Sequence, residues 1–138
     1  MSDEIPIVGG NRQRIKPGEY DACVVSYQRV TKFNRKQVRF RFRLFEMGPL
    51  HNLELDGYAA LGHDGSVRPD SKLARWYGVV AEYSGSRKDR ISLLAFKKFW
   101  FRVQIVTVHQ DREQKVLADI HQYEVVRDIL AVVGRVGA

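Results

Sequence analysis

Residues 35–46 read RKQVRFRFRLFE, and their side chains alternate strictly in character from Val38 onward. Four apolar side chains share one parity: Val38, Phe40, Phe42 and Leu44. The residues between them are all arginines: Arg39, Arg41 and Arg43. Because successive side chains of a β-strand point to opposite faces, this stretch predicts a strand with an apolar face and an arginine face.

The arginine face belongs to a wider concentration of positive charge. The chain has 23 Lys and Arg against 16 Asp and Glu, which gives a formal charge of +7 and a pI near 9.8. Residues 29–43 contain seven basic residues and no acid. A basic segment of this kind indicates a polyanionic partner.

Length and composition limit the class of protein. A chain of 138 residues indicates one domain with a substantial core. Its single cysteine, Cys23, can form neither an intrachain disulfide nor a Cys-based zinc site, which favours a reducing, cytoplasmic compartment. The sequence shows no signal peptide and no apolar run of the roughly 18 residues that cross a bilayer, so we expect no membrane contact.

Turn-forming residues and the spacing of apolar residues predict where the other helices and strands lie. We expect a loosely ordered arm over 1–16, a first strand from Tyr20 to about Thr31, a turn through Asn34, and a third strand over 53–61 with Gly57 as a bulge or close approach. A helix follows over 70–83, with Asp70 or Ser71 as its N-cap. Its predicted apolar stripe is Leu73, Trp76, Tyr77, Val80 and Tyr83. Residues 91–96 suit a short helical turn, and 97–110 a fourth strand.

The last segment, 121–133, is ambiguous. Tyr123, Val125 and Val126 suit a strand, whereas a helical stripe would run through Val125, Val126, Ile129, Leu130 and Val133. We favour a strand through about Val126, reached by a turn or loose hairpin over 111–120, and leave the remainder open.

Three strands, a helix and two strands follow one another in this reading. That order predicts a mainly β fold, an OB-fold-like five-stranded barrel over 17–138 with the helix between strands 3 and 4. OB-folds commonly bind oligonucleotides on their sheet face and loops.

A nucleic-acid site follows from the basic and aromatic residues that such a barrel would expose. Cations can follow phosphates while aromatic faces stack on unpaired bases. The candidates on or near the first two strands are Arg29, Lys32, Phe33, Arg35, Lys36, Arg39, Arg41 and Arg43. Those elsewhere are Tyr58, Arg87, Lys88, Lys97, Lys98, Trp100 and Arg102. Phe33 is the preferred stacking residue because it lies in a predicted turn between basic residues, with Trp100 and Tyr58 next.

Catalytic and metal motifs are missing from the sequence. There is no HExxH, CxxC, Walker-type phosphate loop, GxGxxG or GxSxG pattern. His63 with Asp56 or Asp64 is the nearest approach to a catalytic pair, and no identifiable nucleophile accompanies it. A nuclease or nucleotide-processing enzyme would need clustered carboxylates around a metal, and Asp56 and Asp64 come nearest to that. We therefore expect no enzyme activity, no metal and no cofactor.

Five segments together resemble a known family: KPGEYDACVVSY (16–27), VRFRFRLFE (38–46), SKLARWYGVV (71–80), SLLAFKKFWFRVQIV (92–106) and QYEVVRDIL (122–130). They look like the small OB-fold single-stranded DNA-binding proteins of phages, plasmids and integrating elements. The resemblance implies a non-catalytic protein that coats single strands during replication or recombination.

The leading hypothesis is therefore largely sequence-independent binding of single-stranded DNA, with RNA left open as a ligand and homo-oligomerisation as an option. The rival is a β-barrel protein–protein interaction or assembly module whose basic face meets an acidic partner. Exposure of Phe33 or Trp100 between cations distinguishes the two, because only the first hypothesis needs an accessible ring.

Overall fold

The computed structural model describes residues 15–45, 48, 50–85, 87, 89–108 and 123–137. The opening stretch forms β2 (Arg35–Phe45), and its alternation is confirmed. Its four even-numbered apolar side chains, Val38 to Leu44, are at most 1% exposed, while Arg39 is exposed and Arg41 and Arg43 are partly so.

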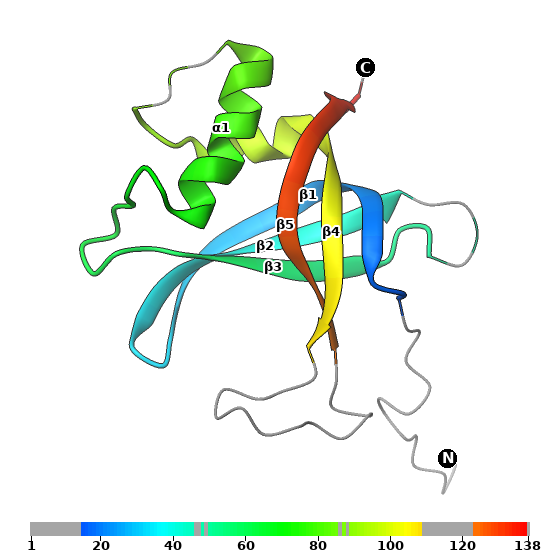
Figure 1. Cartoon of the computed structure of the whole chain (residues 1–138), viewed down its shortest axis with the longest axis horizontal. Helices are drawn as coiled ribbons and strands as arrows, with labels where there is room; N and C mark the ends of the chain where they lie inside the picture. Colours follow the sequence, from blue (N-terminus) through cyan, green and yellow to red (C-terminus); the bar gives the residue numbers. More distant parts are fainter. Residues whose placement is uncertain are drawn as a thin grey trace, which may run out of the picture.

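Five strands close into a ring in the order β1-β2-β3-β5-β4 (Figure 1). The strands other than β2 are β1 (Gly18–Lys32), β3 (Glu54–Ala60), β4 (Phe99–Val108) and β5 (Tyr123–Arg135). β3 and β5 pair in parallel, and the other neighbouring strands pair antiparallel. With a helix between β3 and β4, this topology is OB-fold-like, as the order of elements predicts.

The barrel closes between β3 and β5 at Gly57, whose register partner is Val126. A Cβ at Gly57 would lie 2.8 Å from Cε2 of Phe42 and 3.1 Å from the carbonyl oxygen of Val126. The Phe42 ring is fully buried and tilted against Phe40, so it has little room to move. The close approach expected at Gly57 is confirmed, because a side chain there would hold the two strands apart.

Helix α1 (Lys72–Ser84) packs on the barrel with the indole of Trp76 at its centre. Ser71 is the N-cap, its hydroxyl accepting a hydrogen bond of 3.1 Å from the amide of Ala74. Trp76 is fully buried, its ring centroid 5.8 Å from that of Phe40, and its Nε1 donates to Oδ1 of Asp128 at 2.6 Å. Leu73, Tyr77 and Val80 are buried as predicted.

Tyr83 departs from the predicted helical stripe. It is exposed and meets the ring of Phe99 edge-on at 5.6 Å. It lies at the flank of the stripe in the last turn of α1, where Ala81 takes the buried position instead. After α1 comes the expected short helical turn, a 3₁₀ helix, η1 (Leu93–Lys98), that begins and ends two residues later than expected. Lys97 and Lys98 therefore belong to η1 and not to β4, which follows directly.

β5 continues as a strand to Arg135, so the helical reading of its second half is wrong. Its register with β4 shifts at three places, and the unpaired residues are Arg127, Leu130 and Val133. Each shift adds one residue to β5. Inward positions therefore recur every third residue, at Val126, Ile129 and Val132, and this spacing imitates a helix in the sequence.

Only the end of the predicted arm falls within the described residues. Ile15 is buried in the core, and its amide donates to Oε1 of Glu124 at 3.2 Å. The rest of the arm and the turn expected over 111–120 lie outside the described residues. Within the part of the chain that is described, no helix is long and apolar enough to cross a membrane.

Barrel closure can be tested by comparing two glycines. Gly57→Ala should lower the free energy of unfolding by about 2 kcal/mol, because the methyl group overpacks the seam against Phe42 and Val126. Gly78→Ala is the control: an added Cβ on α1 meets nothing within 4 Å, and it should raise stability by roughly 1 kcal/mol through helix propensity. Urea unfolding measures both. Equal stability of Gly57→Ala and the wild type would contradict the close approach.

Candidate nucleic-acid interface

The turn between β1 and β2 presents an aromatic ring at its tip. Lys32 and Arg35 are register partners, so Phe33 and Asn34 form a two-residue turn. Both have a left-handed backbone, with φ of 54° and 60°, as a type I′ turn requires. This conformation costs a non-glycine residue about 1–2 kcal/mol, and Asn accepts it more readily than Phe. The Phe33 side chain is nevertheless 58% exposed.

Cations flank this ring. Nζ of Lys32 lies 5.6 Å from the centroid of the Phe33 ring, within the range of a cation–π contact. Arg35 is exposed and lies directly across the strand pair from Lys32. The tip of the hairpin therefore combines a stacking surface with two positive charges, as the sequence predicts for Phe33.

The three arginines of β2 lie on the outer face of the barrel, each between a residue of β1 and a residue of β3. The rows across the three strands are Gln28–Arg39–Tyr58, Ser26–Arg41–Asp56 and Cys23–Arg43–Glu54. Arg39 is the most exposed of the three and donates to Oε1 of Gln28 at 2.8 Å. A neutral amide leaves the charge of Arg39 uncompensated at this contact.

Arg41 is neutralised by acids of β3. Its Nε lies 3.1 Å from Oε1 of Glu54, and its Nη1 lies 3.0 Å from Oδ1 of Asp56. Burial by itself would lower the pKa of the Arg41 guanidinium, but the hydrogen bonds that it donates to Asp56 and Glu54 outweigh this, and its pKa is raised. Residues 29–43 thus contain no acidic residue, but two acidic residues of the neighbouring strand β3 contact this segment across the sheet.

Arg43 points at a buried thiol. Its Nη2 lies 3.9 Å from Sγ of Cys23. Burial raises the pKa of the Cys23 thiol, while the charge of Arg43 opposes that rise. Cys23 is thus a small buried side chain, and the neutral thiol leaves the charge of Arg43 unbalanced at this contact.

Trp100 and Arg102 lie at the other end of the hairpin strands from Phe33. Trp100 is half-buried and meets the ring of Phe45 edge-on at 5.3 Å. Nε of Arg102 lies 3.1 Å from Oδ1 of Asp21 in an ion pair. Since Phe45 ends β2 and Phe33 precedes it, roughly 30 Å of strand separates the two aromatic groups. They do not form one stacking platform.

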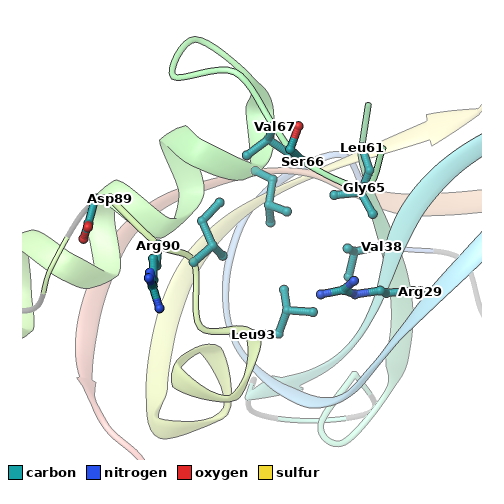
Figure 2. A pocket seen from close by; sticks show the side chains of 11 residues that line it. Arg29, Val38, Leu61, Gly65, Ser66, Val67, Asp89, Arg90 and Leu93 are labelled. Atoms are coloured by element: carbon teal, nitrogen blue, oxygen red, sulfur yellow. The ribbon is translucent and has the colours of Figure 1, made fainter. Parts of the chain in front are cut away.

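Arg29 and Lys36 project to the face of the hairpin opposite the arginine face. Arg29 pairs with Val38, which belongs to the inward parity of β2, and it borders a pocket (Figure 2). Lys36 has the same parity, and its Nζ donates to the carbonyl of His63 at 2.6 Å. The structure therefore distributes the basic residues of this segment over both faces of one hairpin.

The remaining basic candidates lie apart from the hairpin tip. Arg87 forms an ion pair with Asp89, and Lys88 lies outside the described residues. Lys97 and Lys98 are exposed at the end of η1, which lies beside α1 and away from the β1–β2 turn (Figure 1).

Tyr58 adds a second ring to the arginine face, opposite Arg39. It is half-buried, and its hydroxyl lies 3.5 Å from Oδ2 of Asp56. Burial raises the pKa of the Tyr58 phenol, and the Asp56 carboxylate adds to the rise. Tyr58 and Tyr123 line a groove of about 310 Å³ between β3 and β5.

On the described strands, two exposed aromatic residues were not among the predicted site residues: Phe45, 56% exposed, and Tyr123, 43% exposed. Phe45 carries a signal that could have found it, because it has the parity of the arginines in the opening stretch. Tyr123 has no such signal, since its place next to β3 follows from barrel closure.

The described residues contain no group of three or more His, Cys, Asp or Glu side chains placed to hold a metal ion. Asp56 is bound to Arg41, and Asp64 accepts hydrogen bonds from the amide and hydroxyl of Ser66. A scan of the sequence against models of protein families finds no match, and a comparison with curated proteins finds no relative.

The strain at the tip gives a stability prediction. Phe33→Asn should raise the free energy of unfolding by about 1 kcal/mol, because Asn accepts the left-handed conformation more readily than Phe. Phe33→Leu, which keeps an apolar side chain in the same conformation, should stay within roughly 0.5 kcal/mol of the wild type. Thermal or urea unfolding checks both, and a destabilised Phe33→Asn would show that the ring contributes more to folding than its conformation costs.

Proposed function

We propose that this protein binds single-stranded nucleic acid, single-stranded DNA foremost, through the tip of the β1–β2 hairpin and the adjoining arginine face. The binding is non-catalytic and largely independent of sequence. The phosphates of the nucleic acid contact the cations, and its unpaired bases stack on exposed aromatic rings.

The observation that carries this proposal is the exposed ring of Phe33. A large apolar side chain in a left-handed turn combines backbone strain with loss of burial, and both disfavour Phe at this position for folding alone. Such strained positions cluster at functional sites. An aromatic ring between Lys32 and Arg35 is suited to an unpaired base, whose face is accessible only in single strands.

Arg39 and Tyr58 extend the site along the barrel. They are register partners on the outer face, which places a cation beside a second aromatic ring. Arg41 contributes less to phosphate binding than its position suggests, because Glu54 and Asp56 already compensate its charge. Arg43 continues the phosphate path.

The biological setting follows from the resemblance in sequence pattern to phage and plasmid proteins, and we propose a role in replication or recombination of a mobile element. The competing proposal, a module that binds an acidic protein, needs the same cations but no accessible ring. The exposure of Phe33 supports the nucleic-acid proposal over this rival.

Fluorescence anisotropy with a labelled oligo-dT tests the proposal. Unlabelled single-stranded DNA, duplex DNA and RNA of matched length serve as competitors. Single-stranded DNA should compete better than duplex. If about six phosphates are neutralised, the plot of log affinity against log salt should have a slope near −4. Absence of binding at low salt, or an affinity that does not change with salt, would rule the proposal out.

Stacking by Phe33 can be separated from its effect on folding. Phe33→Asn should weaken oligo-dT binding about tenfold, because base–aromatic stacking contributes about 1–3 kcal/mol per base. Phe33→Trp keeps a stacking surface at the same place and should retain wild-type affinity to within about threefold. An equal loss of binding in both variants would mean that the ring does not stack on a base.

Release of Arg41 from its acids gives a gain-of-binding prediction. The double variant Glu54→Gln with Asp56→Asn should bind oligo-dT about fivefold more tightly, the effect of roughly 1 kcal/mol. Its salt slope should steepen by about 0.7, since one more cation reaches a phosphate. The control, Glu19→Gln with Glu82→Gln, removes the same charge from exposed positions on β1 and α1 that form no ion pair among the described residues. If the control gains as much affinity, only net charge matters.

A further inference from the structure

A pocket of about 320 Å³ lies behind the hairpin, on the face opposite the arginine face (Figure 2). Its walls come from four separate parts of the chain: Arg29 and Val38 of the hairpin, residues 61–67 after β3, Leu73 of α1, and residues 89–93, which lead into η1. Ligand pockets begin at about 300 Å³, so this one suits a small ligand.

Most of the wall is apolar. Val38 and Leu73 are buried, and the half-buried side chains around them complete the surface: Leu61, Val67, Ile91 and Leu93. A wall of aliphatic side chains can pack against the face of a flat ring such as a nucleobase.

Positive charge borders this apolar wall on two sides. Figure 2 shows the guanidinium of Arg29 extending into the pocket, with Arg90 across from it on the 89–93 segment. Asp89 also lines the pocket, but its carboxylate is held by the guanidinium of Arg87. Among the residues that the structure describes, Arg29 and Arg90 form no ion pair. The pocket therefore favours an anion beside its apolar wall.

The loop that forms one rim is fixed by its own hydrogen bonds. Gly62 N donates to Ser66 O at 2.7 Å, and Oδ1 of Asp64 accepts from the Ser66 hydroxyl at 2.6 Å. The hydrogen bonds from Ser66 hold the pKa of the Asp64 carboxyl below its usual value. Lys36 ties the hairpin to this loop twice, through its Nζ to His63 O and through its carbonyl, which accepts from Leu61 N at 2.8 Å.

We propose that this pocket binds one nucleotide, with the base against the aliphatic wall and the 5′-phosphate between Arg29 and Arg90. The inference rests on the proposed function where the nucleotide is part of a strand. In that case a single strand continues from the arginine face around the hairpin edge, past Phe33, into the pocket. A free nucleoside monophosphate offers the same chemistry, and the experiment distinguishes the two sources.

The direct probe is dTMP, titrated into the ¹⁵N-labelled protein and followed by NMR, with thymidine and inorganic phosphate as partial ligands. We expect dTMP to shift the amides of Ser66, Ile91 and Leu93, and each partial ligand to bind at least about tenfold more weakly. Equal binding of phosphate and dTMP would overturn the proposal in favour of a simple anion site. Unshifted pocket amides would overturn it as well.

Two variants locate the binding. Arg29→Gln should weaken dTMP binding about tenfold through loss of a charge-assisted hydrogen bond, and Leu93→Trp should weaken it by filling the pocket. Lys16→Gln, an exposed change of the same charge just before β1, is the control and should bind dTMP like the wild type. Wild-type dTMP binding by Arg29→Gln would contradict the proposal even if Leu93→Trp failed to fold.

Oligo-dT binding by the same variants separates this inference from the proposed function. Weaker oligo-dT binding by Arg29→Gln and Leu93→Trp supports a pocket that receives a nucleotide of the strand. If the pocket variants bind oligo-dT as tightly as the wild type and only Phe33→Asn weakens that binding, the nucleic acid does not enter the pocket. The proposed function would then stand without this inference. Binding of dTMP without any oligo-dT binding by the wild type would refute the proposed function and assign the pocket to a free nucleotide.

Discussion

The contact between β3 and β5 at Gly57 and Val126 is the constraint on which the barrel depends. β3 approaches β5 closely at this seam, and a Cβ at Gly57 would collide with the Phe42 ring of β2. Closure also brings β5 within reach of α1, where Asp128 accepts the indole hydrogen bond of Trp76. Because side chains alternate along β2, burial of its apolar side chains inside the closed barrel places the arginines on the outer face.

Strict alternation made β2 predictable from its sequence, and a serine before an apolar stripe made the start of α1 predictable. β5 was predictable only as far as Val126. Its extra residues at Arg127, Leu130 and Val133 are accommodated against β4. A bulge is a property of two paired strands, so the sequence of β5 alone could not distinguish three of them from a helical repeat.

The candidate site likewise has features that could be predicted from the sequence and features that could not. Phe33 was predictable as an exposed ring because a turn between charged residues offers it no core to enter, and the structure shows it exposed. The neutralisation of Arg41 was not predictable, because Glu54 and Asp56 meet it only through the register of β2 with β3. The separation of Trp100 from Phe33 could not be predicted for a related reason: parity tells which face a residue occupies, but not how far along the sheet it lies.

The two-residue turn also bears on the kinetics of binding. A turn of this length leaves the backbone around Phe33 with little freedom to lose, so the chain that carries the ring is already ordered before any ligand arrives. Much of the ordering entropy that a flexible binding loop would lose on contact is lost when the chain folds. Encounter should then be governed by long-range attraction between the basic hairpin and a polyanion, which makes association fast and leaves differences in affinity to the rate of release.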